Sequence, residues 1–160
     1  MTILITGGAG LIGSRLADWF IEKRPDVKVV GVDSLFGGYM DNVNPAVEFY
    51  KRDLAVEPIK DLFEKYKFDY VFHFAAYAAE GLSPFMRKFN YANNVGSTVN
   101  IVNECVNFDV KRLVYTSSMS VYGNGVRPGE IFTESDPCMP IDPYGISKYA
   151  CEMDIRVAGD

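Results

Sequence analysis

A tyrosine and a lysine stand four residues apart near the end of the 160-residue chain, at Tyr144 and Lys148. This spacing brings two side chains to the same face of a helix, one turn apart. A phenol with a pKa of about 10 is a poor base at neutral pH, but a nearby ammonium stabilises the phenolate and lowers that pKa. Such a pair arises often by chance, and alone it favours a simple helix-surface pair.

Hydroxyl side chains gather in a second segment, where an apolar run at Arg112–Thr116 ends. If this run is a parallel strand, the hydroxyls that follow it point into the crevice where such sheets bind ligands. The most interesting of them is Ser118. For Ser117 and Ser120 the alternative stays open that they only satisfy backbone groups at the strand end.

A glycine-rich segment near the amino terminus has the spacing of a dinucleotide-binding loop. It fits both G-x-G-x-x-G and T-G-x-x-G-x-x-G, through Gly7, Gly8, Gly10 and Gly13. A predicted strand at Ile3–Thr6 precedes it and a predicted helix at Leu11–Lys23 follows, which is the context that the motif requires. Backbone N–H groups at the helix start, at Leu11 and Ile12, then face a pyrophosphate. The alternative is a glycine-rich turn without a ligand.

An aspartate, Asp33, lies 20 residues beyond Gly13, at the end of the second predicted strand. A carboxylate there accepts hydrogen bonds from the adenosine ribose and repels a 2′-phosphate. The segment Ser34–Tyr50 holds no Arg or Lys that could neutralise such a phosphate, and Lys51 and Arg52 come only after the third predicted strand. The sequence therefore predicts NAD rather than NADP. A loop-capping aspartate is the alternative reading of Asp33.

Predicted strands and helices alternate along the chain and must position these groups. We predict strands at Ile3–Thr6, Val27–Val32, Val47–Tyr50, Tyr70–Phe74 and Arg112–Thr116. The predicted helices are Leu11–Lys23, Pro58–Tyr66, Pro84–Asn107 and a last one from Tyr144 to Asp160, and the irregular segments are Ser34–Pro45 and Tyr122–Pro143. This pattern is typical of an α/β fold of Rossmann type, a doubly wound parallel sheet in three layers.

Composition narrows the class of protein. With 48% hydrophobic and 23% charged residues and a net charge of −5, the chain predicts one domain and shows no basic footprint for nucleic acid or membrane. No apolar run reaches the roughly 18 residues of a membrane span. One histidine and three widely spaced cysteines predict no metal site, no disulfide framework and a cytoplasmic protein.

Taken together, these motifs resemble the extended short-chain dehydrogenase/reductase family, in particular its NAD-dependent nucleotide-sugar epimerases and dehydratases. The resemblance covers the whole chain. It is carried by the T-G-x-x-G-x-x-G loop, Asp33, Asp53-Leu54, His73-Phe74-Ala75-Ala76, Asn94, Ser118 with Val121-Tyr122-Gly123, and Tyr144 with Lys148.

The resemblance implies roles for these residues. Tyr144 would be the acid/base, Lys148 would hold the nicotinamide ribose and lower the tyrosine pKa, and Ser118 would hydrogen-bond the reacting hydroxyl. Asn94 and His73 are expected to be structural. The positions expected to contact NAD are Gly7, Gly10, Leu11, Ile12, Gly13, Asp33, Ser34, Asp53, Leu54, Phe74, Ala75, Ala76, Asn94, Thr116, Tyr144 and Lys148.

The residues around Ser118 discriminate between reactions of the family. The dehydratases carry Thr-Asp-Glu where this chain has Ser118-Met119-Ser120, and the decarboxylases place a glutamate at Ser120. Without the acid and base that water elimination needs, 4-epimerisation of a nucleotide sugar by transient oxidation at carbon 4 is the remaining simple assignment. UDP-sugars are the expected substrates. The known UDP-galactose epimerases, however, have a lysine where Tyr77, Ala78, Ala79 and Glu80 stand here.

Family members resembling this chain are about twice as long, and their second half binds the nucleotide sugar. We therefore expect residues 1–160 to be an NAD-binding domain without its substrate domain, with little turnover of its own; a fragment is favoured, and a naturally half-length protein is the alternative. We also expect a homodimer that packs the helix at 84–107 and the last helix, with Ile101 or Val102 at that surface or else facing the sheet. The alternatives are a non-catalytic NAD-binding module and another reductase or dehydratase; retention of Tyr144, Lys148 and Ser118 favours the enzyme.

Overall fold

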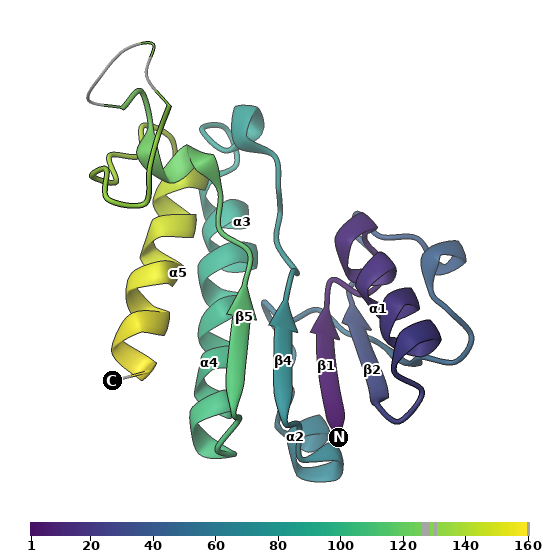
Figure 1. The fold of residues 1–160 in the computed structure, drawn as a ribbon. Helices are drawn as coiled ribbons and strands as arrows, with labels where there is room; N and C mark the ends of the chain where they lie inside the picture. Colours follow the sequence, from purple (N-terminus) through teal and green to yellow (C-terminus); the bar gives the residue numbers. More distant parts are fainter. Residues whose placement is uncertain (126–128, 130, 160) are drawn as a thin grey trace.

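The sheet of the molecule has five parallel strands in the order β3-β2-β1-β4-β5. A computed structural model of the chain describes residues 1–125, 129 and 131–159 (Figure 1). The strands are β1 (Thr2–Thr6), β2 (Lys28–Asp33), β3 (Glu48–Lys51), β4 (Tyr70–His73) and β5 (Arg112–Tyr115). Each lies within two residues of its predicted bounds, and the predicted parallel sheet is confirmed.

The central strand β1 is apolar because both of its faces are covered. Ile3, Leu4 and Ile5 are all 0% exposed, and Ile5 lies in register with Gly31 of β2 and Phe72 of β4. A near-continuous hydrophobic run is what a parallel strand buried on two faces requires. The carboxyl ends of β1, β2 and β4 consequently meet at one edge of the sheet.

Helices cover the two faces unequally (Figure 1). On one face α1 (Leu11–Lys23) buries Ala17 and Phe20 against Ile3, Ile5 and Val29, while Trp19, in edge contact with Phe20, stays half exposed. On the other face lie α2 (Lys60–Tyr66) and α4 (Ser97–Asn107), with α5 (Pro143–Gly159) packed beside α4. The predicted three-layer arrangement is therefore confirmed.

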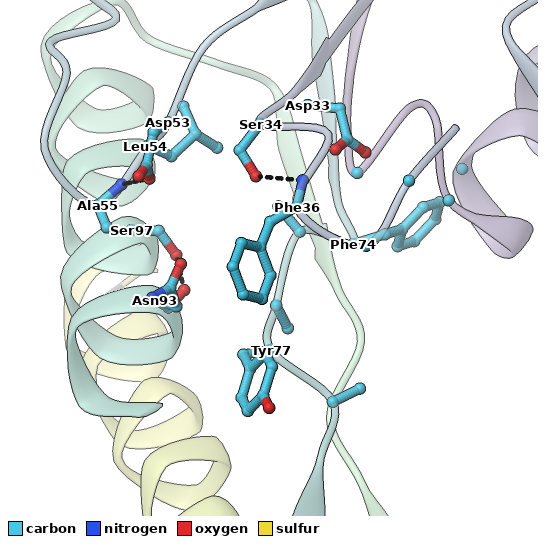
Figure 2. Close-up of a pocket in the computed structure, with 18 of the residues that line it drawn as sticks. Asp33, Ser34, Phe36, Asp53, Leu54, Ala55, Phe74, Tyr77, Asn93 and Ser97 are labelled. Carbon is cyan, nitrogen blue, oxygen red and sulfur yellow. Dashed lines mark hydrogen bonds between the residues drawn. The ribbon is translucent and has the colours of Figure 1, made fainter. Parts of the chain in front are cut away.

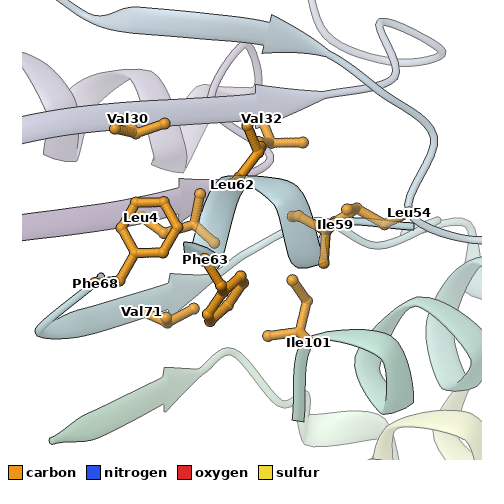
Figure 3. Close-up of a cluster of buried hydrophobic side chains, with 10 residues drawn as sticks. All are labelled: Leu4, Val30, Val32, Leu54, Ile59, Leu62, Phe63, Phe68, Val71 and Ile101. Carbon is orange, nitrogen blue, oxygen red and sulfur yellow. The ribbon is translucent and has the colours of Figure 1, made fainter. Parts of the chain in front are cut away.

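The larger core cluster lies between β1, β2, β4 and the pair α2–α4 (Figure 3). Leu62 and Phe63 of α2 and Ile101 of α4 point into it and are essentially inaccessible. Val102 is buried too, at 6% exposed. The expectation that Ile101 or Val102 lies on an exposed association surface was wrong, and the sheet-facing alternative is correct for Ile101.

The predicted helix Pro84–Asn107 is a composite element. It begins at Arg87 as α3 (Arg87–Tyr91), continues through one π-helical stretch, η3 (Ala92–Gly96), and becomes α4. The helix begins three residues later than predicted. Residues around Pro84 instead form hydrogen-bonded turns, which follow the 3-10 turn η2 (Glu80–Leu82). A π-helical stretch inserts an extra residue into a helix and often marks a functional site. Here it buries Asn94, at 1% exposed.

Two further short elements are 3-10 turns. η1 (Met40–Asn42) lies in the predicted irregular segment Ser34–Pro45, whereas η4 (Met119–Tyr122) follows β5 and shares only Tyr122 with the next predicted irregular segment. Within the predicted irregular segment Tyr122–Pro143, residues 126–128 and 130 lie outside the described residues, as does residue 160 of the predicted last helix. Across the described residues, every helix is too short or too polar to traverse a bilayer.

Candidate functional site

A cleft of about 540 Å³ opens at the carboxyl ends of the strands (Figure 2). Twelve of the sixteen positions predicted to contact NAD line it: Gly7, Gly10, Leu11, Ile12, Gly13, Asp33, Ser34, Asp53, Leu54, Phe74, Ala75 and Ala76. Four do not, namely Asn94, Thr116, Tyr144 and Lys148. The structure thus gathers the predicted glycine loop and both aspartates in one cavity.

Close backbone contacts in the glycine loop leave no room for a side chain at Gly7 or Gly13. Gly7 has a φ of +69°, in the left-handed region that favours glycine, and a Cβ on Gly13 would lie 2.2 Å from the carbonyl oxygen of Gly7. No side chain caps α1 at Gly10, and its first turn carries no acidic residue. The first N–H groups of α1, which have no partner within the helix, therefore remain suited to an anion.

Asp33 is buried at the end of β2 and joins two loops of the cleft. Its Oδ2 accepts from the backbone N–H of Ala9 at 3.1 Å, and its Oδ1 accepts from that of Leu35 at 2.8 Å. The loop-capping interpretation of Asp33 is thus realised. It is compatible with a ligand, because each carboxylate oxygen has a second acceptor site.

The cleft also contains residues that the sequence did not predict to contact NAD: Phe36, Gly37, Gly38, Arg52, Ala55, Tyr77, Ala78, Ala79, Asn93 and Ser97. In Figure 2 the rings of Phe36 and Tyr77 lie between the loop that carries Phe74 and the helix that carries Asn93 and Ser97. Asn93 and Ser97 are four residues apart in a predicted helix, a spacing that could have pointed to them. No local signal marks Phe36, whose position depends on packing against Tyr77 and Phe89.

A second cluster brings Lys148 of α5 to the end of β5. Its Nζ donates to the carbonyl oxygen of Thr116 at 2.9 Å and lies 4.9 Å above the ring centroid of Tyr115 and 5.8 Å from that of Tyr144. The side chain is buried, and burial lowers the pKa of Lys148 to about 8. The predicted tyrosine–lysine pair therefore exists in space.

Tyr144 is nearly buried, and this burial raises the pKa of its phenol, while hydrogen bonding with Ser118 acts in the opposite direction. The expected net lowering of this pKa is not seen in the protein alone, because desolvation outweighs the hydrogen bond with Ser118 and the nearby carboxylates of Glu80 and Asp142 raise the pKa further. Ser118 is itself held in place, since its Oγ donates to Ser120 Oγ at 3.0 Å and accepts from the Ser120 N–H at 3.2 Å.

The first turn of α5 is fixed against η4 by a glycine. A Cβ on Gly145 would lie 2.5 Å from the carbonyl oxygen of Ser120. Asp142 Oδ1 accepts from the Gly145 N–H at 2.9 Å, as a helix-capping aspartate does. Gly145 thus permits the close approach that places Tyr144 beside Ser118.

Asn94 connects the cleft with the tyrosine helix. Its Oδ1 accepts from the Tyr77 N–H at 2.7 Å, and its Nδ2 donates to Asn90 Oδ1 and to Ser147 Oγ at 3.0 and 3.1 Å. With its amide used by neighbours in this way, Asn94 has the geometry of a structural residue, as expected. The hydroxyl of Ser117 donates a hydrogen bond to the carboxylate of Glu152 on α5.

His73 is fully buried between two threonines. Its Nδ1 lies 2.6 Å from Thr6 Oγ1, and its Nε2 lies 3.0 Å from Thr98 Oγ1. Burial lowers the pKa of His73 to about 3, so the ring is neutral. It ties β1 and β4 to α4, which fits the structural role expected for it.

The part of the chain that the structure describes contains no group of three His, Cys, Asp or Glu residues placed to hold a metal ion. The three cysteines are free thiols.

Comparisons with known proteins agree on one family. A model of the NAD dependent epimerase/dehydratase family matches residues 3–159. UDP-glucose 4-epimerase of Streptococcus mutans is 40% identical over 157 residues, which are 95% of this chain and 45% of that protein.

Solved structures agree with this match. The structure of UDP-glucose 4-epimerase with UDP-glucose from Thermotoga maritima has a TM-score of 0.92 at 32% identity, covering 99% of this chain and 51% of that one. UDP-glucose 4-epimerase of Thermus thermophilus in complex with NAD has a TM-score of 0.89 at 31% identity, with the same coverage, 99% and 51%. The chain therefore spans about half the length of the proteins it matches.

Proposed function

The chain belongs to the NAD-dependent epimerase/dehydratase family, and from this membership we propose that it is the NAD-binding part of a nucleotide-sugar 4-epimerase. The observation that carries the proposal is the meeting of Ser118, Tyr144 and Lys148 beside a cleft built around a dinucleotide loop. A binding module that only holds NAD needs no acid/base, so a tyrosine placed beside Ser118 and Lys148 favours the enzyme.

The residues of the cleft fit the cofactor. The uncapped start of α1 suits the pyrophosphate, and Asp33, with acceptor sites to spare, suits the adenosine ribose. Asp53 and Leu54 would border the adenine, and Phe74 to Ala76 would follow the dinucleotide toward Tyr77. When bound, NAD supplies the redox chemistry by accepting a hydride from carbon 4 of the sugar and returning it.

The protein's own contribution is proton transfer and positioning. Tyr144 would take the proton of the sugar 4-hydroxyl and give it back, while Ser118 would turn its hydroxyl hydrogen from Ser120 to the same sugar oxygen. Since burial raises the pKa of Tyr144, the phenol needs positive charge nearby to act as a base. Lys148 supplies that charge, and its hydrogen bond to the carbonyl of Thr116 fixes the ammonium in position.

For the substrate, UDP-sugars are the class we propose. Support comes from the relatives, which are UDP-glucose 4-epimerases, and from Met119 and Ser120, which lack the acid and base of a dehydratase. We further propose that the sugar nucleotide is bound together with a carboxyl-terminal half, that the protein acts as a homodimer, and that it is cytoplasmic.

The first test is cofactor binding to the 160-residue chain by titration calorimetry. NAD should bind better than NADP, and Asp33→Ala should narrow the difference, because it removes both the ribose acceptor and the repulsion of a 2′-phosphate. Tyr144→Phe is the matched control and should keep its NAD affinity. Tighter binding of NADP than of NAD by the unmodified chain would refute the cofactor assignment.

The second part of the test concerns turnover. The chain alone should convert UDP-glucose little or not at all. Joined to the carboxyl-terminal half of a relative, Tyr144→Phe should lower the rate at least about 100-fold, and Ser118→Ala should cost less, since the base stays in place. If the Tyr144→Phe protein kept most of its rate, the proton acceptor would have to be another residue.

A further inference from the structure

Among the described residues that line the cleft, Arg52 is the one with a cationic side chain. It directly follows β3, and its backbone N–H donates to the carbonyl oxygen of Asp33 at 2.9 Å. The base of the Arg52 side chain therefore lies beside the residue proposed to bind the adenosine ribose. A free guanidinium at this place could form a bidentate pair with a phosphate on that ribose.

The guanidinium of Arg52 is held elsewhere, at the start of α2. Its Nη1 donates to Asp61 Oδ1 at 2.5 Å and to the carbonyl oxygen of Pro58 at 2.8 Å, and its Nη2 donates to Asp61 Oδ2 at 3.0 Å. Both terminal nitrogens are thus committed to neighbours in a fork-to-fork geometry. The hydrogen bonds with Asp61 also raise the pKa of Arg52 and lower that of Asp61.

We infer that Asp61 is a specificity-determining residue: by holding the Arg52 guanidinium against α2, it denies NADP the cation that a 2′-phosphate needs. The inference rests on the proposed NAD-binding function and adds to it a second element of discrimination. Asp33 repels the phosphate directly, and Asp61 withholds the partner that could offset this repulsion. Selectivity of this kind, by disfavouring the competitor, requires no additional contact with NAD.

The strength of this pair sets the size of the expected effect. The Asp61 side chain is 60% exposed and that of Arg52 19%, so water and salt screen the pair. Exposed ion pairs contribute little to stability, and the fold should tolerate loss of the carboxylate. Arg52 would then be free to turn into the cleft, while Asp33 continues to disfavour NADP.

The test is calorimetric titration of NAD and NADP at low ionic strength into the unmodified chain and Asp61→Ala. We expect Asp61→Ala to bind NADP about three- to tenfold more tightly than the unmodified chain, with NAD affinity nearly unchanged. Glu64→Ala is the matched control, because Glu64 lies on the same helix and pairs with Lys60 rather than with Arg52. It should change neither affinity.

A double variant identifies the cation. In Arg52→Met/Asp61→Ala the gain in NADP affinity should disappear, and Arg52→Met alone should leave the preference unchanged. The inference is overturned if Asp61→Ala shows no gain, or if the gain persists in the double variant. If the unmodified chain binds no NAD, the proposed function fails and the inference with it, whereas normal NAD binding with no effect of Asp61→Ala defeats the inference alone.

Discussion

At the scale of single residues, His73 makes the fold sensitive to acid. Its pKa is about 3 in the folded protein and about 6.5 in an unfolded chain, so between these values the unfolded state binds more protons. The contribution of the neutral ring is complete above pH 6.5 and is lost as pH falls toward 3. The free energy of unfolding should decrease by about 2 kcal/mol from pH 6.5 to pH 5 through His73 alone.

Urea unfolding at the two pH values measures this decrease. His73→Gln is the control, because a glutamine amide can donate and accept near Thr6 and Thr98 but does not titrate. Its stability should depend less on pH in this interval, even if it is lower throughout. Equal pH dependence in both proteins would show that His73 is not responsible.

Residues whose role follows from local spacing could be predicted from the sequence. Gly7, Gly10, Gly13 and Asp33 all line the cleft, because a strand, a turn and a helix in succession place them there. The sequence shows Arg52 only as a cation beyond the third strand. Its ion pair with Asp61 depends on how α2 docks beside β3, which local spacing does not predict. The sequence also could not predict that the pKa of Tyr144 is raised, because this shift depends on how deeply the phenol is buried.

At the scale of elements, the contact between η4 and α5 sets the geometry of Ser118 and Tyr144. Gly145→Ala would bring a methyl group to about 2.5 Å from the carbonyl oxygen of Ser120, so the two elements must separate. We expect a loss of stability of about 1–3 kcal/mol, as in other overpacked sites.

Gly159→Ala, on the same helix, provides the comparison, because a Cβ there would have no neighbour within 4 Å. Thermal unfolding followed by circular dichroism should show a lower melting temperature for Gly145→Ala only. Similar melting temperatures for the two variants would mean that the first turn of α5 can shift without cost.

The types of the elements were predictable because apolar residues recur with different periods in strands and in helices. The predicted bounds of α1, Leu11–Lys23, are those that the structure shows. The composite helix was not predictable in detail. Its π-helical stretch accommodates the buried amide of Asn94, whose partners Tyr77 and Ser147 are distant in sequence. The same stretch decides that the Ile101 side chain points toward the sheet, because an inserted residue rotates the part of the helix that follows it.

At the scale of the whole molecule, α4 and α5 carry apolar side chains on their outer surfaces. Val106 is 56% exposed, and Met153 and Val157 are 46% and 76% exposed. We predict that two copies of the chain associate through these helices, because burying the exposed groups removes apolar surface from water. Sedimentation at micromolar concentration should show a dimer that Met153→Lys/Val157→Lys converts to a monomer.

Val56→Lys is the control for this prediction, since Val56 is equally exposed, at 76%, but lies between β3 and α2. It should leave the dimer intact. The control matters because β5 is an edge strand with Val114 40% exposed, so association through other surfaces must be distinguished. A monomer at all concentrations would contradict the prediction.

The half-exposed Trp19 gives the molecule an optical reporter of its own. It is the single tryptophan of the chain and lies eight residues along α1 from Leu11, about 12 Å from the cleft measured on the helix axis. Indole emission overlaps the absorption band of a reduced nicotinamide and not that of the oxidised ring. Resonance energy transfer from Trp19 therefore distinguishes the two oxidation states of a dinucleotide in the cleft without any attached dye.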